Sequence, residues 1–170
     1  GRTGKLWAHE WAGVMPDVMA VAKGIGGGFP IGAVMATAEA AKGMTAGTHG
    51  STFGGNHLAA AVADKVLEIV SDENFLKNVR QVGELLRTEI EKLCDAHPNV
   101  FKSVRGAGLM LGIECGPPNG ELVDLAREEG LISVVAGDNI LRLVPPLIIE
   151  KSHVEEAVGI LAKVAQRAET

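Results

Sequence analysis

Lys23 is the residue whose type and surroundings are best suited to covalent chemistry. It follows an apolar run at residues 17–22 and precedes the glycine-rich segment GIGGG at residues 24–28. The run predicts a buried strand, and partial desolvation at its end favours a neutral, nucleophilic amine. The glycines allow close approach of a bulky ligand. They match neither common nucleotide-binding fingerprint, so spacing alone leaves an ordinary surface lysine as the alternative.

Two adjacent hydroxyl residues, Ser51 and Thr52, lie in a segment rich in Gly, Thr, Ser and Asn at residues 44–56. Such a composition predicts a loop. Hydroxyl groups and the backbone N–H groups of a loop suit phosphate oxygens. The alternative interpretation is an ordinary Ser/Thr turn without a ligand.

Arg142 lies within the apolar run at residues 140–144, where an isolated positive charge requires a partner. A planar guanidinium matches a carboxylate in bidentate fashion, which indicates an acidic ligand. The alternative is an ion pair with a structural Asp or Glu. Arg105, which precedes Gly106, is interpreted as structural.

The elements around these residues follow from periodicity and turn signals. Strands are predicted at residues 17–22 and 31–36, and a helix at residues 57–70 begins after a cap at Asn56. A longer helix ends before Pro98.

The second half of the chain alternates between apolar runs and amphipathic segments. We expect one kinked strand over residues 104–115, a short helix capped by Asn119, and strands at residues 131–135 and 140–144. Ser152 and Glu155 have the spacing of a capping box for the last helix.

Composition excludes several classes of protein. The 170 residues fit one ordinary domain, and the net charge of −5 without a basic cluster argues against a nucleic-acid partner. No apolar run reaches the roughly 18 residues that span a bilayer. Cys94 and Cys115 are interpreted as reduced thiols. These features predict a cytoplasmic protein, and the loop-like opening without a Met suggests a fragment.

The segment PDVMAVAKGIGGGFPIGA, at residues 16–33, resembles the cofactor-lysine signature of the class III (ornithine-type) aminotransferases, which depend on pyridoxal 5'-phosphate. Three further segments are similar to this family in the same order along the chain. They are GRTGK at residues 1–5, GTHGSTFGGN at residues 47–56 and LRLVPPL at residues 141–147.

This resemblance implies roles for four residues. Lys23 would hold pyridoxal phosphate as a Schiff base and then serve as the general base that moves a proton on the substrate. Thr52 would bind the cofactor phosphate of the neighbouring subunit, with Ser51 as a weaker candidate. Arg142 would hold the substrate carboxylate. The implied assembly is a homodimer with a shared active site.

The resemblance also implies the architecture, which is α/β and corresponds to the C-terminal portion of a fold type I pyridoxal-phosphate transferase. Residues 1–70 would end a large domain with a mostly parallel sheet. Residues 71–170 would form a small domain of two to three helices on a largely antiparallel sheet. The acidic partner of the pyridine nitrogen and the aromatic ring over the cofactor would lie upstream, so we expect this chain alone to be poorly active or inactive.

Within the family, AHEWAG at residues 8–13 and GGGFP at residues 26–30 are most similar to bacterial members that act on N-acetylornithine. The implied reaction transfers the ω-amino group of N-acetylornithine or a similar diamino acid to 2-oxoglutarate, in arginine biosynthesis. The alternatives are an ornithine or 4-aminobutyrate aminotransferase, an aminomutase, or a non-catalytic isolated fragment.

Overall fold

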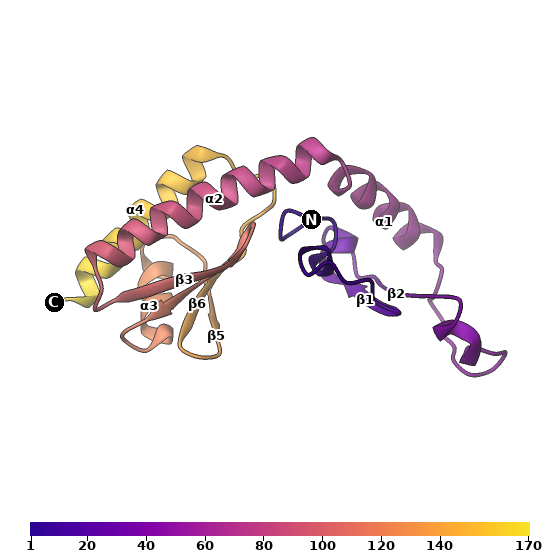
Figure 1. Ribbon diagram of the computed structural model, residues 1–170. Helices are drawn as coiled ribbons and strands as arrows, with labels where there is room; N and C mark the ends of the chain where they lie inside the picture. Colours follow the sequence, from indigo (N-terminus) through magenta and orange to yellow (C-terminus); the bar gives the residue numbers. More distant parts are fainter. The chain divides into compact units, whose positions relative to one another are not determined.

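The computed structural model describes residues 1–170 (Figure 1). It divides into two compact units, Leu6–Phe75 on the one hand and Gly1–Lys5 together with Leu76–Thr170 on the other. The first five residues therefore pack with the C-terminal part of the chain. The domain division predicted from the sequence, at residue 70, concerns the complete protein and stays a prediction. None of the helices is long and apolar enough to cross a membrane.

The unit Leu6–Phe75 contains one two-stranded sheet and one α-helix. Strand β1 pairs antiparallel with β2, and the register runs from Val18 opposite Ala36 to Ala22 opposite Gly32. The mostly parallel sheet predicted for the large domain is thus not contained in this unit. The elements are η1 (Ala8–Trp11), β1 (Val18–Ala22), η2 (Lys23–Gly26), β2 (Gly32–Ala36), η3 (Ala40–Gly43) and α1 (His57–Val70).

This unit has almost no core of its own. Only Gly26, Ala59 and Ala63 are buried in it. The prediction that residues 17–22 form a buried strand is wrong for this chain, because β1 alternates between exposed and half-buried positions. Large apolar side chains such as Met15 and Phe53 are 84% and 80% exposed. A segment that buries so little surface is not stable alone and requires cover by other protein.

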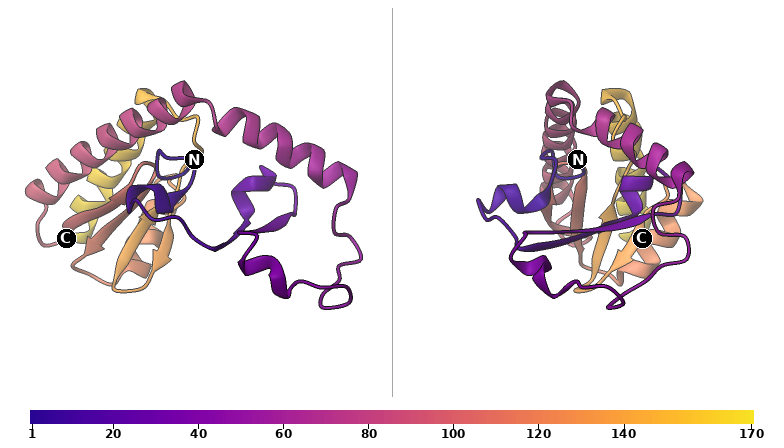
Figure 2. Two further views of the ribbon diagram at one scale, coloured as in Figure 1. Left: turned by 45° about the vertical axis from the view of Figure 1, so that its right-hand side comes forward. Right: turned by 90° about the vertical axis from the view of Figure 1, so that its right-hand side faces the viewer.

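The second unit is a four-stranded antiparallel sheet with three helices, as expected for residues 71–170. The strand order is β3-β4-β6-β5. Helices α2 and α4 run side by side along the sheet (Figures 1 and 2), and α3 contacts α4, β5 and β6. The elements are α2 (Glu73–Ala96), β3 (Phe101–Ala107), β4 (Met110–Cys115), α3 (Asn119–Glu128), β5 (Val134–Ala136), β6 (Ile140–Leu143) and α4 (Lys151–Ala168).

The core of this unit lies between one face of the sheet and the helices. Alternate positions of β4 and β6 are buried, among them Ile113 and Leu141, which are both fully inaccessible. Ile90 of α2 and Leu161 of α4 are equally inaccessible and supply the helical side of the core. The sheet therefore has a packed face and an opposite face that is available for other contacts.

The kinked strand predicted at residues 104–115 is wrong, because the segment forms a hairpin of β3 and β4. Ala107 pairs with Met110 across the turn. Gly106 and Gly108 adopt φ angles of 132° and 54°, which glycine reaches without strain. The continuous apolar character of the run conceals the reversal, since both strands bury apolar side chains.

The predicted caps are correct in one case and wrong in two. Asn56 caps α1, since its Oδ1 accepts the N–H of Ala59 at 2.9 Å. Asn119 is the first residue of α3, and Pro118 occupies the cap position. The side chain of Asn119 instead binds carbonyl groups in neighbouring strands.

The capping box predicted for the last helix is also displaced. Helix α4 begins at Lys151, so the cap position belongs to Glu150, and Ser152 lies within the first turn. The N–H of Glu150 donates to Nδ1 of His153 at 3.1 Å, which satisfies a backbone donor at this end. Ser152 has the spacing of a cap, but Glu150 occupies the cap position because its backbone is extended there.

Candidate active site

Lys23 stands at the junction between a strand and a tight helical turn. β1 ends at Ala22, and Lys23 opens η2 with a φ angle of 55°. Only Asp138 and Asn139 share this left-handed conformation among the non-glycine residues. Such strained backbone is typical of functional sites, where the surrounding structure enforces it.

The surroundings of Lys23 leave room for a ligand. A Cβ atom placed on Gly24 would meet no heavy atom within 4 Å. Lys23 is exposed, and its amine has no hydrogen-bond or ion-pair partner within the chain. The partial desolvation expected from the sequence is therefore not provided by these 170 residues.

Ser51 and Thr52 lie in the loop before α1, as predicted, and both are exposed. Neither hydroxyl forms a hydrogen bond within the chain, so both are available to a ligand. A cavity of about 230 Å³ is lined by Ser51, by residues 53–56 and by the start of β2. Thr52 and Lys23 do not line it, so the structure does not bring these two residues together around this cavity.

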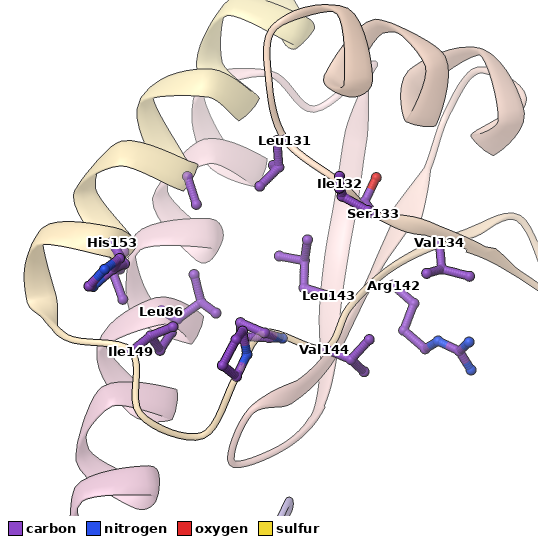
Figure 3. A pocket seen from close by; sticks show the side chains of 14 residues that line it. Leu86, Leu131, Ile132, Ser133, Val134, Arg142, Leu143, Val144, Ile149 and His153 are labelled. Carbon is purple, nitrogen blue, oxygen red and sulfur yellow. The ribbon is translucent and has the colours of Figure 1, made fainter. Parts of the chain in front are cut away.

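Arg142 projects from β6 on the face of the sheet opposite the packed core. It pairs with Gly112 of β4 and Val134 of β5. In Figure 3 its guanidinium points away from the helices, on the same side of the strand as Val134. The side chain of Arg142 is exposed, and its guanidinium forms no ion pair or hydrogen bond within the chain. The alternative of a structural Asp or Glu partner is thus not realised in this chain.

Arg105 differs from Arg142 although the two lie in one row of the sheet. Gly112 pairs with Arg105 on one side and with Arg142 on the other, so both arginines belong to the same face. Arg105 already has a carboxylate partner, because its Nη2 lies 3.5 Å from Oδ2 of Asp138. Both groups are largely exposed, so the pair contributes little to stability.

Sequence reasoning missed the cavity shown in Figure 3, which has a volume of about 360 Å³. Its walls include Leu86 of α2, Leu143 of β6 and Val154 of α4, and Arg142 and Val134 also line it. The hydroxyl of Ser133 is buried at its edge without a hydrogen-bond partner. Residues 142–146 of the segment LRLVPPL line part of this cavity, but the other walls come from segments that are far apart in the chain, which no local pattern brings together. Its walls are mostly apolar, and Ser133, Arg142 and His153 supply the polar side chains that line it.

Residues 1–165 match the family described as aminotransferase class-III. The chain belongs to the class-III aminotransferase family. The family predicted from the four sequence segments is thereby confirmed. Among curated relatives, the chain is 52% identical over 167 residues to the acetylornithine aminotransferase of Brucella melitensis biotype 1. It is 54% identical over 169 residues to the acetylornithine aminotransferase of Rhodobacter capsulatus.

These alignments cover nearly all of this chain but less than half of the relatives. They include 98% and 99% of this chain, and 41% and 43% of the two relatives. This class-III chain therefore spans about two fifths of the length of the curated relatives it matches. Residues that belong to the remainder of those proteins have no counterpart among these 170.

Solved structures confirm the predicted fold class. The crystal structure of N-acetylornithine aminotransferase from Stenotrophomonas maltophilia K279a matches with a TM-score of 0.87 and 36% identity, over 99% of this chain and 44% of that chain. The ornithine aminotransferase of Toxoplasma gondii ME49 matches with a TM-score of 0.90 and 31% identity, over 99% of this chain and 41% of that chain.

Proposed function

We propose that the complete protein transfers the ω-amino group of N-acetylornithine, or of a similar diamino acid, to 2-oxoglutarate in arginine biosynthesis, with pyridoxal phosphate as cofactor. The observation that carries this proposal is the 52–54% identity to acetylornithine aminotransferases over nearly the whole chain. The residues implied by the family resemblance are all present in the chain, and the structure leaves each of them without a competing partner.

The side chains in the unit Leu6–Phe75 fit this cofactor. The cofactor carries an aldehyde and a phosphate, and it requires an amine for the first and donors for the second. Lys23 offers an unpartnered amine beside the open space at Gly24. Thr52, and more weakly Ser51, offer exposed hydroxyls to the phosphate. Pyridoxal phosphate supplies an electron sink for the carbon that bears the amino group.

The protein's own contribution is to bind the substrate and to move a proton. Nζ of Lys23 is the base that would take the proton from the donor carbon bearing the amino group, and in the second half-reaction it would deliver a proton to the corresponding carbon of the 2-oxo acid. The guanidinium of Arg142 binds a substrate carboxylate through two parallel N–H donors, which fixes the orientation of the substrate. Both half-reactions use the same two residues, because both substrates carry a carboxylate.

We further propose a cytoplasmic homodimer with a shared active site. The exposed apolar surface of Leu6–Phe75, with Val34 and Leu58 70% and 63% exposed, supports extensive cover by the remaining chain and by a second subunit. Thr52 would then reach the cofactor of the neighbouring subunit. Cys94 and Cys115 are free and buried, which supports a reducing compartment.

Ornithine is the second candidate substrate. Ornithine aminotransferases match the chain with a TM-score of 0.90, although their sequence identity is lower, at 31–33%. The substrate side chain is recognised in part by residues outside this chain, so substrate assays must decide.

The test is an assay of the purified full-length protein with 2-oxoglutarate and three amino donors, namely N-acetylornithine, ornithine and 4-aminobutyrate. We expect the highest kcat/KM for N-acetylornithine, with one glutamate formed per donor consumed. Lys23→Ala is the inactive control. A preference for ornithine or 4-aminobutyrate would reassign the substrate, and a lack of transfer with every donor would contradict the proposed reaction.

A further inference from the structure

The strand that carries Arg142 ends one residue after it. Arg142 is the third of the four residues of β6, and Leu143 is the last. Pro145 and Pro146 follow, and proline has no N–H to continue a ladder of hydrogen bonds. The position of Arg142 thus depends on the weakly held end of a strand.

The register of β4 and β6 identifies the position where the ladder of backbone hydrogen bonds between the two strands is interrupted. Leu111 pairs with Leu143. Two residues further along, the same register places Leu109 opposite Pro145. A regular pair at this position would require an N–H that Pro145 does not have.

The side chain of Arg2 occupies this position. Its Nη1 donates to the carbonyl of Leu109 at 3.1 Å and also to the carbonyl of Pro145. The N–H of Leu109 donates in turn to the carbonyl of Arg2 at 3.0 Å. Arg2 therefore provides the donor that the proline lacks and joins the end of β6 to the start of β4.

The backbone around Arg2 is fixed on two sides. A Cβ atom on Gly108 would lie 2.7 Å from the carbonyl oxygen of Arg2, so only glycine permits this approach. Nη1 of Arg80 donates to the carbonyl of Gly4 at 2.6 Å. The segment Gly1–Lys5 is thus held against the β3–β4 turn, and Arg2 is partly buried there. A guanidinium held in this way is preorganised to bridge two carbonyls.

We propose that Arg2 is a positioning residue for Arg142. By bridging the carbonyls of Leu109 and Pro145, it keeps the end of β6 in register with β4 and so fixes the direction in which Arg142 meets a substrate carboxylate. This inference rests on the carboxylate-binding role of Arg142 in the proposed function.

The experiment compares Arg2→Ala and Arg2→Lys with the wild-type full-length holoenzyme. Arg2→Ala should raise the KM for the amino donor about tenfold, while kcat changes less than about twofold. The reason is that a displaced guanidinium of Arg142 weakens binding of the substrate carboxylate but does not affect the proton transfer. Arg2→Lys should lie between the two, since an ammonium can also donate to both carbonyls but its flexible stem holds it there less rigidly than the planar guanidinium.

A double mutant separates positioning from general stability. If Arg2 acts through Arg142, Arg2→Ala should cause no further rise in KM in an Arg142→Ala background. Arg87→Ala is the matched control, because Arg87 of α2 donates to the carbonyls of Val104 and Gly106 in the same hairpin and forms no hydrogen bond with β6. Its KM should equal that of the wild type.

Hydrogen exchange of residues 143–147 gives a readout that does not depend on the reaction. Exchange at Leu143 and Val144 should accelerate in Arg2→Ala and not in Arg87→Ala. An unchanged KM in Arg2→Ala, or an equal rise in the Arg142→Ala background, would overturn the positioning role. Failure of both Arg2 variants to fold would also overturn it, since Arg2 would then be a general determinant of folding. If the wild type transfers no amino group while the exchange result holds, the proposed function alone has failed.

Discussion

The backbone N–H of Asn119 donates to Oδ1 of Asn139 at 2.8 Å. Nδ2 of Asn139 donates in turn to the carbonyls of Cys115 and Pro117, at 2.8 and 2.9 Å. One side chain thus joins the end of β4, the start of α3 and the β5–β6 turn. Because β6 begins at Ile140, immediately after this turn, Asn139 sets the near end of the strand that presents Arg142.

Asn139→Ala should lower the free energy of unfolding of the C-terminal unit by about 2–4 kcal/mol. It removes three hydrogen bonds and leaves alanine in the left-handed region, where asparagine is tolerated better. The measurement is the midpoint of denaturant unfolding in the full-length protein. Asp138→Ala is the matched control, because Asp138 has the same backbone conformation but only one long contact at 3.5 Å. Equal losses in the two variants would contradict the role of the hydrogen bonds.

Lys23 should be the residue that carries the cofactor in the full-length protein. Borohydride reduction followed by peptide mass mapping should place a pyridoxyl group on the peptide that contains Lys23. The label should vanish in Lys23→Ala and persist in Lys42→Ala, whose side chain forms an exposed ion pair with Glu39. A label on Lys5 or Lys42 would disprove the assignment while leaving the family intact.

Arg142→Ala should raise the KM for the amino donor and leave the absorbance of the bound cofactor unchanged. The loss of a charge-assisted bidentate contact should cost about 2–5 kcal/mol of substrate binding. Arg105→Ala is the matched control, because Arg105 lies in the same row on the same face but is engaged by Asp138. Similar kinetics for Arg142→Ala and the wild type would remove Arg142 from the site.

Thr52→Ala should weaken cofactor binding by about 1.5–3 kcal/mol, or roughly tenfold to hundredfold, because a hydrogen bond to a charged phosphate is lost. An absorbance titration of the apoenzyme measures this directly. Ser51→Ala should have a smaller effect.

The shared site predicted from Thr52 can be tested by mixing subunits. A heterodimer of Lys23→Ala and Thr52→Ala subunits should contain one intact site if Thr52 serves the neighbouring subunit. Its cofactor affinity at that site should then equal that of the wild type. Weak binding at the remaining Lys23 site would instead show that Thr52 acts within its own subunit.

The buried thiols of Cys94 and Cys115 should make stability depend on alkaline pH. Burial raises the pKa of both thiols above the usual value of about 8.5, and nearby Asp95 and Glu91 raise that of Cys94 further. The folded protein thus keeps these protons after the unfolded chain has lost them.

This contribution of the two thiols to the free energy of unfolding is fully present below about pH 8.5 and is lost as the pH rises through the folded-state pKa. The denaturation midpoint of the wild type should fall more steeply above pH 8.5 than that of a Cys94→Ala/Cys115→Ala double variant, and parallel curves would contradict this.

The sequence by itself determined the family, the positions of β1, β2, α1 and α2, and the cap at Asn56. These features depend on local patterns, namely apolar periodicity, turn residues and the short segments around Lys23 that resemble the family. It also identified the candidates Lys23, Thr52 and Arg142 through side-chain chemistry matched to the segments of the family, and their roles are predictions that the experiments above address.

The tertiary structure alone decided which partners these residues have. Asn119 is a residue type that commonly caps helices, but its side chain instead donates to the carbonyls of Ala136 in β5 and Ile140 in β6. Nothing local indicates that Arg2 lies between Leu109 and Pro145, because more than a hundred residues separate it from each of them. Such contacts form only when distant segments pack, and a pattern of neighbouring residues does not encode the geometry of that packing.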